Sequence, residues 1–283
     1  MDLRDFDVEK PPDSNEPPRS PYPWALVIIG VVIVLGVVGY MVWSRRSPDS
    51  AAPAAGRDAP STARDGVPPK PLGGPGDGMP LPPLDETDPV VRTLVQGLSN
   101  HPTIAAWLTT DNLIRSFTAA VHNVAAGANP TAHARQLAPT GPFRVIEGNG
   151  AHIDPRSYGR YDRIGDAVAS VEAAKAAGVY SALKPRIEEA HAEQGVGGTF
   201  DASLERAIVE LLETPVIDGP IALVPKGVGY AFADPRLEQL TPPQKQLLRM
   251  GPRNARRIQA KLREIGRELG IPEERLPSTP TTS

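Results

Sequence analysis

The sequence predicts a mostly α-helical globular domain with a minor β component, preceded by a single transmembrane helix and a Pro-rich disordered linker. Three observations lead to this fold class: apolar residues at helical spacing after residue 87, an uncharged apolar segment at residues 24–43, and the distribution of the 33 prolines among 283 residues. Sixteen prolines fall in residues 1–83, where the segments flanking the apolar run are too polar to build a core. The chain therefore divides into an acidic disordered N-terminal tail, a transmembrane helix, a disordered linker, a helical domain and a disordered C-terminal tail, at residues 1–23, 24–43, 44–86, 87–271 and 272–283.

The overall composition excludes several classes of protein. Lys and Arg number 30 and Asp and Glu number 33, and the net charge of −3 argues against a protein that coats nucleic acid with its whole surface. The chain has no Cys, which excludes disulfide bridges, thiolate zinc sites and Cys nucleophiles.

The segment Trp24–Trp43 contains twenty consecutive residues without a charge. At 1.5 Å per residue, a helix of this length spans about 30 Å, the thickness of the hydrocarbon core of a bilayer. Aromatic residues stand at both ends, where the interfacial belts of a membrane helix lie, and Arg45 and Arg46 follow directly. A buried core helix and a cleaved signal peptide are the alternatives, but the acidic leader and the long apolar run disfavour a signal peptide. We therefore expect the lipid bilayer to be one partner of the chain, through Trp24 to Trp43.

The charges that flank this anchor do not decide its orientation. Residues 1–23 carry three Lys or Arg and the equal stretch 44–66 carries four, so the positive-inside rule favours neither side. We expect the inner (cytoplasmic) membrane of a bacterium as the location, with the globular domain on the periplasmic or external side, because a short tail, an anchor and a tethered domain are a common layout there. The cytoplasmic orientation stays open.

Helix signals begin at Asp88. Asp88 followed by Pro89 places an N-capping carboxylate before a proline in the first turn, and the same Asp-Pro pair recurs at residues 154 and 234. Thr241 and Gln244 have the spacing of a capping box. Apolar stripes at helical spacing occupy three segments: Val90, Val91, Leu94, Val95 and Leu98; Leu113, Ile114, Phe117, Val121 and Val124; Leu204, Ile208, Leu211 and Leu212.

A longer helical stretch covers residues 163–193. It contains Pro185, which we expect to end or kink the helix near Lys184. Together with the stripes, this stretch predicts a core built by five to seven helices.

Two stretches interrupt the helical pattern and predict short β-hairpins. Asn149-Gly150 between short apolar segments is a strong turn signal, and a two-residue turn there would pair Ile146 with Ile153. The second candidate covers residues 221–232, where apolar residues alternate on both sides of a Pro-Lys-Gly sequence.

Three segments of the folded part resemble the bacterial family called domain of unknown function 3014. They are Leu137–Phe143, Ala207–Val216 and, most clearly, Leu247–Leu262. The resemblance covers about residues 88–270 and implies the same layout of hydrophobic N-terminal segment, Pro-rich linker and domain. It implies no reaction, cofactor or catalytic residue.

The sequence offers no strong catalytic or metal signature. Its five histidines include no His-Glu-x-x-His pattern. Glu188 and His191 form one Glu-x-x-His motif, which we interpret as a solvated helix face rather than part of a di-iron site. No Gly-x-Ser-x-Gly elbow is present. We therefore assign no catalytic residue, cofactor, metal or oligomeric state, and we expect a binding protein more than an enzyme.

The strongest local signal is a basic segment near the C-terminus. Residues 244–269 hold eight Lys or Arg against two Glu, a local charge of +6, and Gly251-Pro252 should separate two helices within it. Three interpretations stay open: a solvated face with Lys261 and Glu264 paired, a docking surface for an acidic protein or anionic lipid, and a nucleic-acid recognition helix. The candidate partner-binding residues are Arg249, Arg253, Asn254, Arg256 and Arg257. Nucleic acid is the least favoured partner, because no aromatic platform accompanies these residues and the chain is net acidic.

A second, weaker cluster places Arg156, Arg160 and Arg163 at i, i+4 and i+7 beside Tyr158 and Tyr161. Arg and Tyr are typical of interface anchors, although tyrosines packed on the core beneath exposed arginines are the more frequent arrangement.

The sequence thus predicts a single-pass, membrane-anchored protein of the bacterial cell envelope whose domain binds an unknown protein partner without catalysis. Two alternatives stay open. One is a cell-envelope hydrolase or lyase, and the other is a cytoplasm-facing domain whose basic C-terminal helix binds nucleic acid or anionic lipid.

Overall fold

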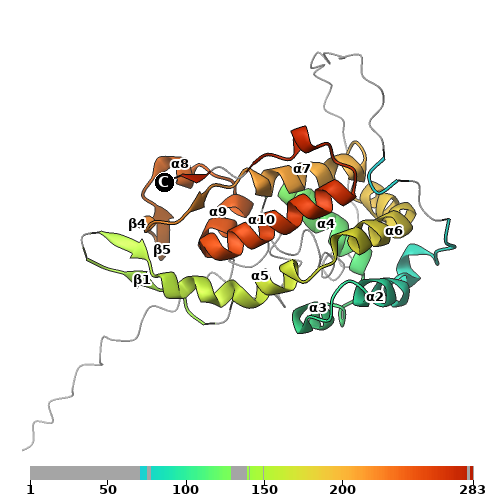
Figure 1. Ribbon diagram of the computed structural model, residues 1–283, viewed down its shortest axis with the longest axis horizontal. Coiled ribbons are helices and arrows are strands. Elements are labelled where there is room, and N and C mark those ends of the chain that lie inside the picture. The colour runs from blue at the N-terminus through green and yellow to red at the C-terminus, as the bar shows by residue number, and fades with distance from the viewer. Residues whose placement is uncertain are drawn as a thin grey trace, which may run out of the picture.

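The computed structural model describes residues 71–74, 78–128, 139, 141–148, 150–278 and 281–282 (Figure 1). The predicted N-terminal tail, transmembrane helix and most of the linker lie outside these residues. Within the described ranges, none of the helices combines the length and the apolar character that crossing a membrane requires.

The described residues form a mostly helical domain with a small antiparallel sheet, as the sequence predicts. The helices, with η marking a 3-10 helix, are η2 (Leu84–Glu86), α2 (Asp88–Gln96), α3 (Pro102–Trp107), α4 (Leu113–Ala125), η5 (Pro155–Tyr161), α5 (Asp162–Ala169), α6 (Ala173–Glu193), α7 (Phe200–Leu212), α8 (Pro235–Glu238), α9 (Pro242–Arg249), α10 (Gly251–Glu268) and η6 (Glu273–Arg275). The strands are β1 (Val145–Ile146), β2 (Ala151–Ile153), β3 (Val216–Ile217), β4 (Ala222–Lys226), β5 (Gly229–Phe232) and β6 (Thr281–Thr282).

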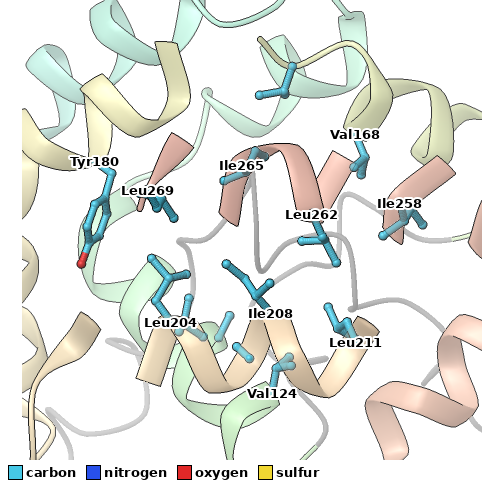
Figure 2. Packing of buried hydrophobic residues seen from close by; sticks show 14 of the residues in the cluster. Val124, Val168, Tyr180, Leu204, Ile208, Leu211, Ile258, Leu262, Ile265 and Leu269 are labelled. Carbon is cyan, nitrogen blue, oxygen red and sulfur yellow. The ribbon is translucent and has the colours of Figure 1, made fainter. Parts of the chain in front are cut away.

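The main hydrophobic core lies between α4, α7 and α10. Val121 of α4, Ile208 of α7 and Leu262 of α10 are each at most 1 % exposed. Figure 2 shows Leu262 and Ile265 of α10 facing Leu204 and Ile208 of α7. Since full burial of such a side chain contributes about 1.5–3 kcal/mol, these stripes supply much of the stability of the domain. The predicted stripes of α4 and α7 are confirmed.

The small sheet has the strand order β1-β2-β4-β5, and all neighbours in it are antiparallel. Both predicted hairpins exist, and the pairing of β2 with β4 joins them into one sheet, which the sequence did not predict. The inner face of the sheet packs with Leu248 of α9 into a second, smaller core through Ile153, Ile221, Leu223 and Phe232. The sheet lies at one end of the helical body (Figure 1).

The register predicted for the first hairpin is wrong by one residue. Val145, not Ile146, lies opposite Ile153. Since paired residues of an antiparallel sheet point to the same face, this register directs Val145 to the small core and leaves Ile146 51 % exposed. The chain after β2 fixes this register, because the N–H of Asp154 donates to the carbonyl of Arg144 at 3.1 Å.

The predicted helix starts are confirmed, but Asp88 does not cap the helix that begins there. The capping box at Thr241 forms, and the aspartates of the second and third Asp-Pro pairs cap η5 and α8. Asp88 lies inside the first turn of α2, after Thr87. Its carboxylate accepts the N–H groups of Asn112 and Leu113, at 2.7 and 2.9 Å. Asp88 therefore caps α4 and ties the two helices together.

We expected Pro185 to end or kink the long helix; an end is wrong, and a kink stays a prediction. The helix α6 runs through Pro185, and the predicted stretch 163–193 breaks instead between α5 and α6. Pro185 is exposed, whereas Leu183 and Ile187 beside it are buried. A proline removes one backbone hydrogen bond, and the packing of the opposite, apolar face keeps the helix intact.

The end of the predicted linker belongs to the folded domain. Leu72 and Leu84 are each 6 % exposed and lie in the main core, so the domain begins before residue 87.

Residues 71–74, which we call the strap, are held by Asp201 of α7. Its carboxylate accepts the N–H of Leu72 at 3.1 Å, the ammonium of Lys184 at 2.6 Å and the hydroxyl of Tyr180. Burial and this hydrogen bond raise the pKa of Tyr180, so the hydroxyl stays a donor.

Further contacts complete the seating of the strap. Lys184 also donates to the carbonyl of Leu72 at 3.1 Å, and the N–H of Gly73 donates to the carbonyl of Leu269 at 2.9 Å, just beyond the end of α10. The first residues of the predicted C-terminal tail are likewise docked, because Leu276 is 5 % exposed and packs on Gly266.

The corner between α9 and α10 requires glycine, and this requirement is testable. Gly251 has a φ of +81°, and a Cβ added there would overlap the ring of Tyr158. We expect Gly251→Ala to lower the free energy of unfolding by about 3 kcal/mol, the sum of a left-handed backbone and an overpacked contact. Urea denaturation of the full chain, followed by circular dichroism, measures this change. Gly178→Ala is the control, because Gly178 lies in α6 with open space around it and should gain roughly 0.5–1 kcal/mol.

The attachment of the strap gives a second prediction. Asp201→Ala removes the common acceptor of three donors, so we expect a loss of about 2–3 kcal/mol and faster hydrogen exchange at residues 72–74. Asp111→Ala serves as the control, because its carboxylate is 83 % exposed in an ion pair with Arg92. That change should cost less than about 1 kcal/mol and leave exchange of the strap unaltered. Unchanged exchange in Asp201→Ala would contradict the role given to this carboxylate.

Candidate functional site

The basic residues predicted on α10 are largely paired with acids of the same chain. Arg253 lies 3.3 Å from Asp162 of α5, and Arg257 pairs with Asp166 one turn later on that helix. Arg256 pairs with Asp218, which follows β3, and this hydrogen bond lowers the pKa of the Asp218 carboxyl. The predicted pair of Lys261 with Glu264 also forms. The local charge of +6 is therefore offset by carboxylates that the fold brings to the helix.

Asn254 does not lie on the surface with the paired arginines of α10. Its side chain is 1 % exposed, and its amide NH2 lies 3.0 Å from the carboxylate of Asp162, 3.0 Å from the carbonyl of Met250 and 3.3 Å from that of Tyr158. Gly165 of α5 lies directly against its amide oxygen. Asn254 thus joins α10 to η5 and α5, and a partner cannot reach it in this fold.

Arg249 differs again from its neighbours on the basic segment. Its guanidinium lies 5.0 Å from the centre of the Phe232 ring, and burial lowers its pKa. The structure thus brings together Arg253, Arg256 and Arg257 as paired surface residues, and it separates Arg249 and Asn254 from them. Partner binding by the three paired arginines stays a prediction.

A second group of arginines lines an open pocket. The pocket has a volume of about 450 Å³, and its lining is Gly141, Pro142, Arg144, Arg156, Gly159 and Arg160. We call it the arginine pocket. Two of its arginines belong to the weaker cluster in the sequence, whereas Arg163 of that cluster does not line it.

Local hydrogen bonds fix the wall of the arginine pocket. Asp154 caps η5 by accepting the N–H of Arg156 at 2.9 Å. The hydroxyl of Ser157 bonds both backbone groups of Arg144, accepting its N–H at 2.8 Å and donating to its carbonyl at 3.1 Å. The start of β1 is therefore tied to η5, which brings Arg144 beside Arg156. Arg144 was missed in the sequence, although the predicted hairpin already places it next to Asp154 and Pro155, where η5 begins.

The side chain of Arg160 is held by two aromatic rings. Its guanidinium carbon lies 5.9 Å from the centre of the Phe143 ring and 5.5 Å from that of Tyr161. Burial lowers its pKa, and its buried Nε has no acceptor among the described residues. The rings fix the position of the cation without using its hydrogen-bonding capacity.

No acidic residue is among the described residues that line the arginine pocket. Within the described ranges, Arg144, Arg156 and Arg160 form no ion pair, in contrast to the arginines of α10. Three arginines therefore line one open cavity, and no carboxylate of the described chain pairs with them. This arrangement favours binding of an anion.

Exposed apolar side chains gather at the same end of the domain. Ile146 and Val224 lie on the outer face of the sheet, 51 % and 45 % exposed, and Val228 at the tip of the second hairpin is 61 % exposed. Phe143, 37 % exposed, lies beside the pocket, where the guanidinium of Arg160 stands over its ring. We call these four residues together with the arginine pocket the sheet-end surface. Such clusters of exposed large apolar residues mark interaction sites.

The Glu-x-x-His motif has a structural role that the sequence did not predict. His191 is 2 % exposed and packs edge-on against Phe200, so its interpretation as part of a solvated face is wrong. The carboxylate of Glu188 accepts the N–H of Phe200 at 3.2 Å, at the start of α7. No cluster of three potential metal ligands exists among the described residues.

The contrast between Asn254 and its basic neighbours gives a stability test. Asn254→Ala leaves a buried carbonyl and part of the Asp162 carboxylate unpaired, so we expect a loss of about 2–3 kcal/mol in unfolding free energy. Arg257→Gln removes only an exposed ion pair and should cost less than about 1 kcal/mol. Urea denaturation of both variants checks this order, and a reversed order would contradict the internal role of Asn254.

The comparisons with known proteins agree with the resemblance noted in the sequence. The chain matches the model of a family described as protein of unknown function (DUF3014) over residues 113–266, which include α4, the whole sheet and most of α10. No curated protein matches the chain. No solved structure matches it either. Because the matched region covers more than half of the 283 residues, the chain belongs to the family DUF3014.

Proposed function

We propose that the protein is a single-pass, membrane-anchored binding protein of the bacterial cell envelope, whose domain docks a protein partner through the sheet-end surface and catalyses no reaction. One observation carries this proposal: arginines that form no ion pair among the described residues lie with exposed apolar side chains at one end of the domain. The arginines of α10, by contrast, are paired with acids. Arginine and aromatic residues beside apolar surface are typical of interface centres.

The anchoring part of the proposal rests on the sequence. The twenty uncharged residues of Trp24–Trp43, with aromatic residues at both ends, fit a membrane span. The inner membrane is the proposed location, with the domain on its outer side. The strap then marks the point where the tether meets the domain.

The positions of the strap and the arginine pocket support this arrangement. The strap bonds to Leu269, at the end of α10, whereas the start of α10 at Gly251 packs on Tyr158 of η5 beside the pocket. α10 has 18 residues, so the two sites are about 27 Å apart along this helix. In Figure 1 the segment before α2 and the sheet likewise lie at opposite ends of the domain. The sheet-end surface is thus presented away from the attachment of the tether.

The proposal can be tested by photo-crosslinking in living cells with the full-length chain. A photoreactive amino acid replaces Val224 on the outer face of the sheet, and the control position is Ala174, which is exposed on α6. We expect a discrete crosslinked protein from position 224 in the membrane fraction and none from position 174. With the probe at Ile146, Val224→Asp should reduce the yield about tenfold, because a charge desolvated at the interface costs at least about 1.4 kcal/mol.

Other outcomes would contradict the proposal. Equal crosslinking from positions 224 and 174 would remove the sheet-end surface as the docking site. A crosslink to nucleic acid or lipid instead of protein would favour the cytoplasm-facing alternative. Recovery of the full chain in the soluble fraction would contradict the anchor, and deletion of residues 24–43 is the control that defines soluble behaviour.

A further inference from the structure

We infer that the arginine pocket binds the phosphate monoester group of a soluble ligand; this inference rests on the proposed function in placing the binding surface at the same end of the domain and in the membrane anchor against which a soluble ligand is weighed. The pocket volume of about 450 Å³ exceeds what a phosphate group alone needs, so it admits a phosphate together with the group that carries it.

Charge is the first argument for this ligand. Arg144, Arg156 and Arg160 bring three positive charges to one cavity, and none forms an ion pair within the described part of the chain. A cavity with this charge attracts anions.

The neighbouring acids are engaged elsewhere, which explains why the pocket stays positive. Asp162, directly after η5, pairs with Arg253 and accepts the amide of Asn254. Asp154, directly before η5, accepts the backbone N–H of Arg156 as a helix cap. The fold therefore commits both acids that flank η5 to structural contacts, and the pocket arginines are left for a ligand.

The number of donors favours phosphate over carboxylate. A phosphate monoester carries a charge of about −1.5 to −2 at pH 7 and three acceptor oxygens, so it can offset most of the three guanidinium charges. A carboxylate carries one charge and two oxygens, which would leave about two positive charges uncompensated. Guanidinium groups bind phosphate oxygens with pairs of parallel hydrogen bonds, and three such groups match a tetrahedral anion better than a planar one.

The pocket is partly organised before the ligand arrives. The rings of Phe143 and Tyr161 hold the guanidinium of Arg160, and the bonds of Ser157 hold the backbone of Arg144. Gly141 and Gly159 line the pocket without side chains, so a ligand can approach its wall closely. Fixing these groups in advance reduces the entropy lost on binding.

A soluble ligand is favoured over the headgroups of the anchoring membrane. The pocket lies near the start of α10 and the strap lies at its other end, about 27 Å away for a helix of 18 residues. A membrane surface close to the tether attachment is therefore remote from the pocket. A phospholipid diester also carries a single negative charge and suits three arginines less well.

Calorimetric titration of the full-length chain in a non-ionic detergent tests this inference. The probes are inorganic phosphate, acetate as a monoanion of similar size, and vesicles of an anionic phospholipid, all at constant ionic strength. We expect phosphate to bind with a dissociation constant on the order of 1 mM and acetate about tenfold more weakly. Arg156→Gln combined with Arg160→Gln should weaken phosphate binding about a hundredfold.

The matched control removes the same number of positive charges, two, from α10 instead of from the pocket. Arg253→Gln combined with Arg257→Gln should leave phosphate binding within about twofold of the unmodified chain, because both side chains are committed to ion pairs. Arg160→Lys keeps the charge and loses the planar fork, and it should weaken binding about tenfold. Circular dichroism confirms that each variant is folded.

Three results would overturn the inference: phosphate binding no tighter than acetate, an equal loss in the α10 control, or binding to vesicles without binding to soluble phosphate. A chain that crosslinks a protein from position 224 yet ignores phosphate would keep the proposed function and remove this inference alone.

Discussion

The contact between α10 and the η5–α5 segment is the interaction on which the rest of the structure depends. At its centre a buried Asn254 binds backbone carbonyls and the carboxylate of Asp162, while Arg253 and Arg257 pair with Asp162 and Asp166 at the edge. A buried amide without partners would cost about 1–3 kcal/mol, so the three acceptors must be positioned correctly for the domain to fold. This requirement fixes the approach of η5 to α10, and with it the site of the arginine pocket.

The same contact determines which arginines are paired with acids, and the sequence alone does not reveal this. The basic segment with a local charge of +6 is the strongest local signal, yet its arginines meet acids that are far away in the chain, such as Asp162 and Asp218. The weaker cluster at Arg156 and Arg160 meets none among the described residues. A net positive surface depends on which acids the fold brings near, and an ion pair spanning 91 residues, like that of Arg253 with Asp162, leaves no local trace.

Prediction from sequence succeeded where the cause of a structure is local. The stripes of α4 and α7, the capping box at Thr241 and the Gly251 corner follow from side-chain spacing and backbone preference over a few residues. It failed where distant contacts decide. The Asp88 carboxylate caps another helix, the register at Ile146 is fixed by the chain after β2, and Leu72 enters the core from a Pro-rich segment.

The position of the strap has a mechanical consequence. Asp201 and the carbonyl of Leu269 attach it to α7 and to the end of α10, so in the proposed anchored protein a pull on the tether would pass to the main helical core. The sheet has its own smaller core around Ile153 and Leu223, at the other end of α10. A ligand or partner at the sheet-end surface therefore neither competes with the strap for contacts nor needs to disturb it. Under the proposed function, the length of α10 separates the attachment of the tether from the binding surface, which is the arrangement that a tethered binding domain requires.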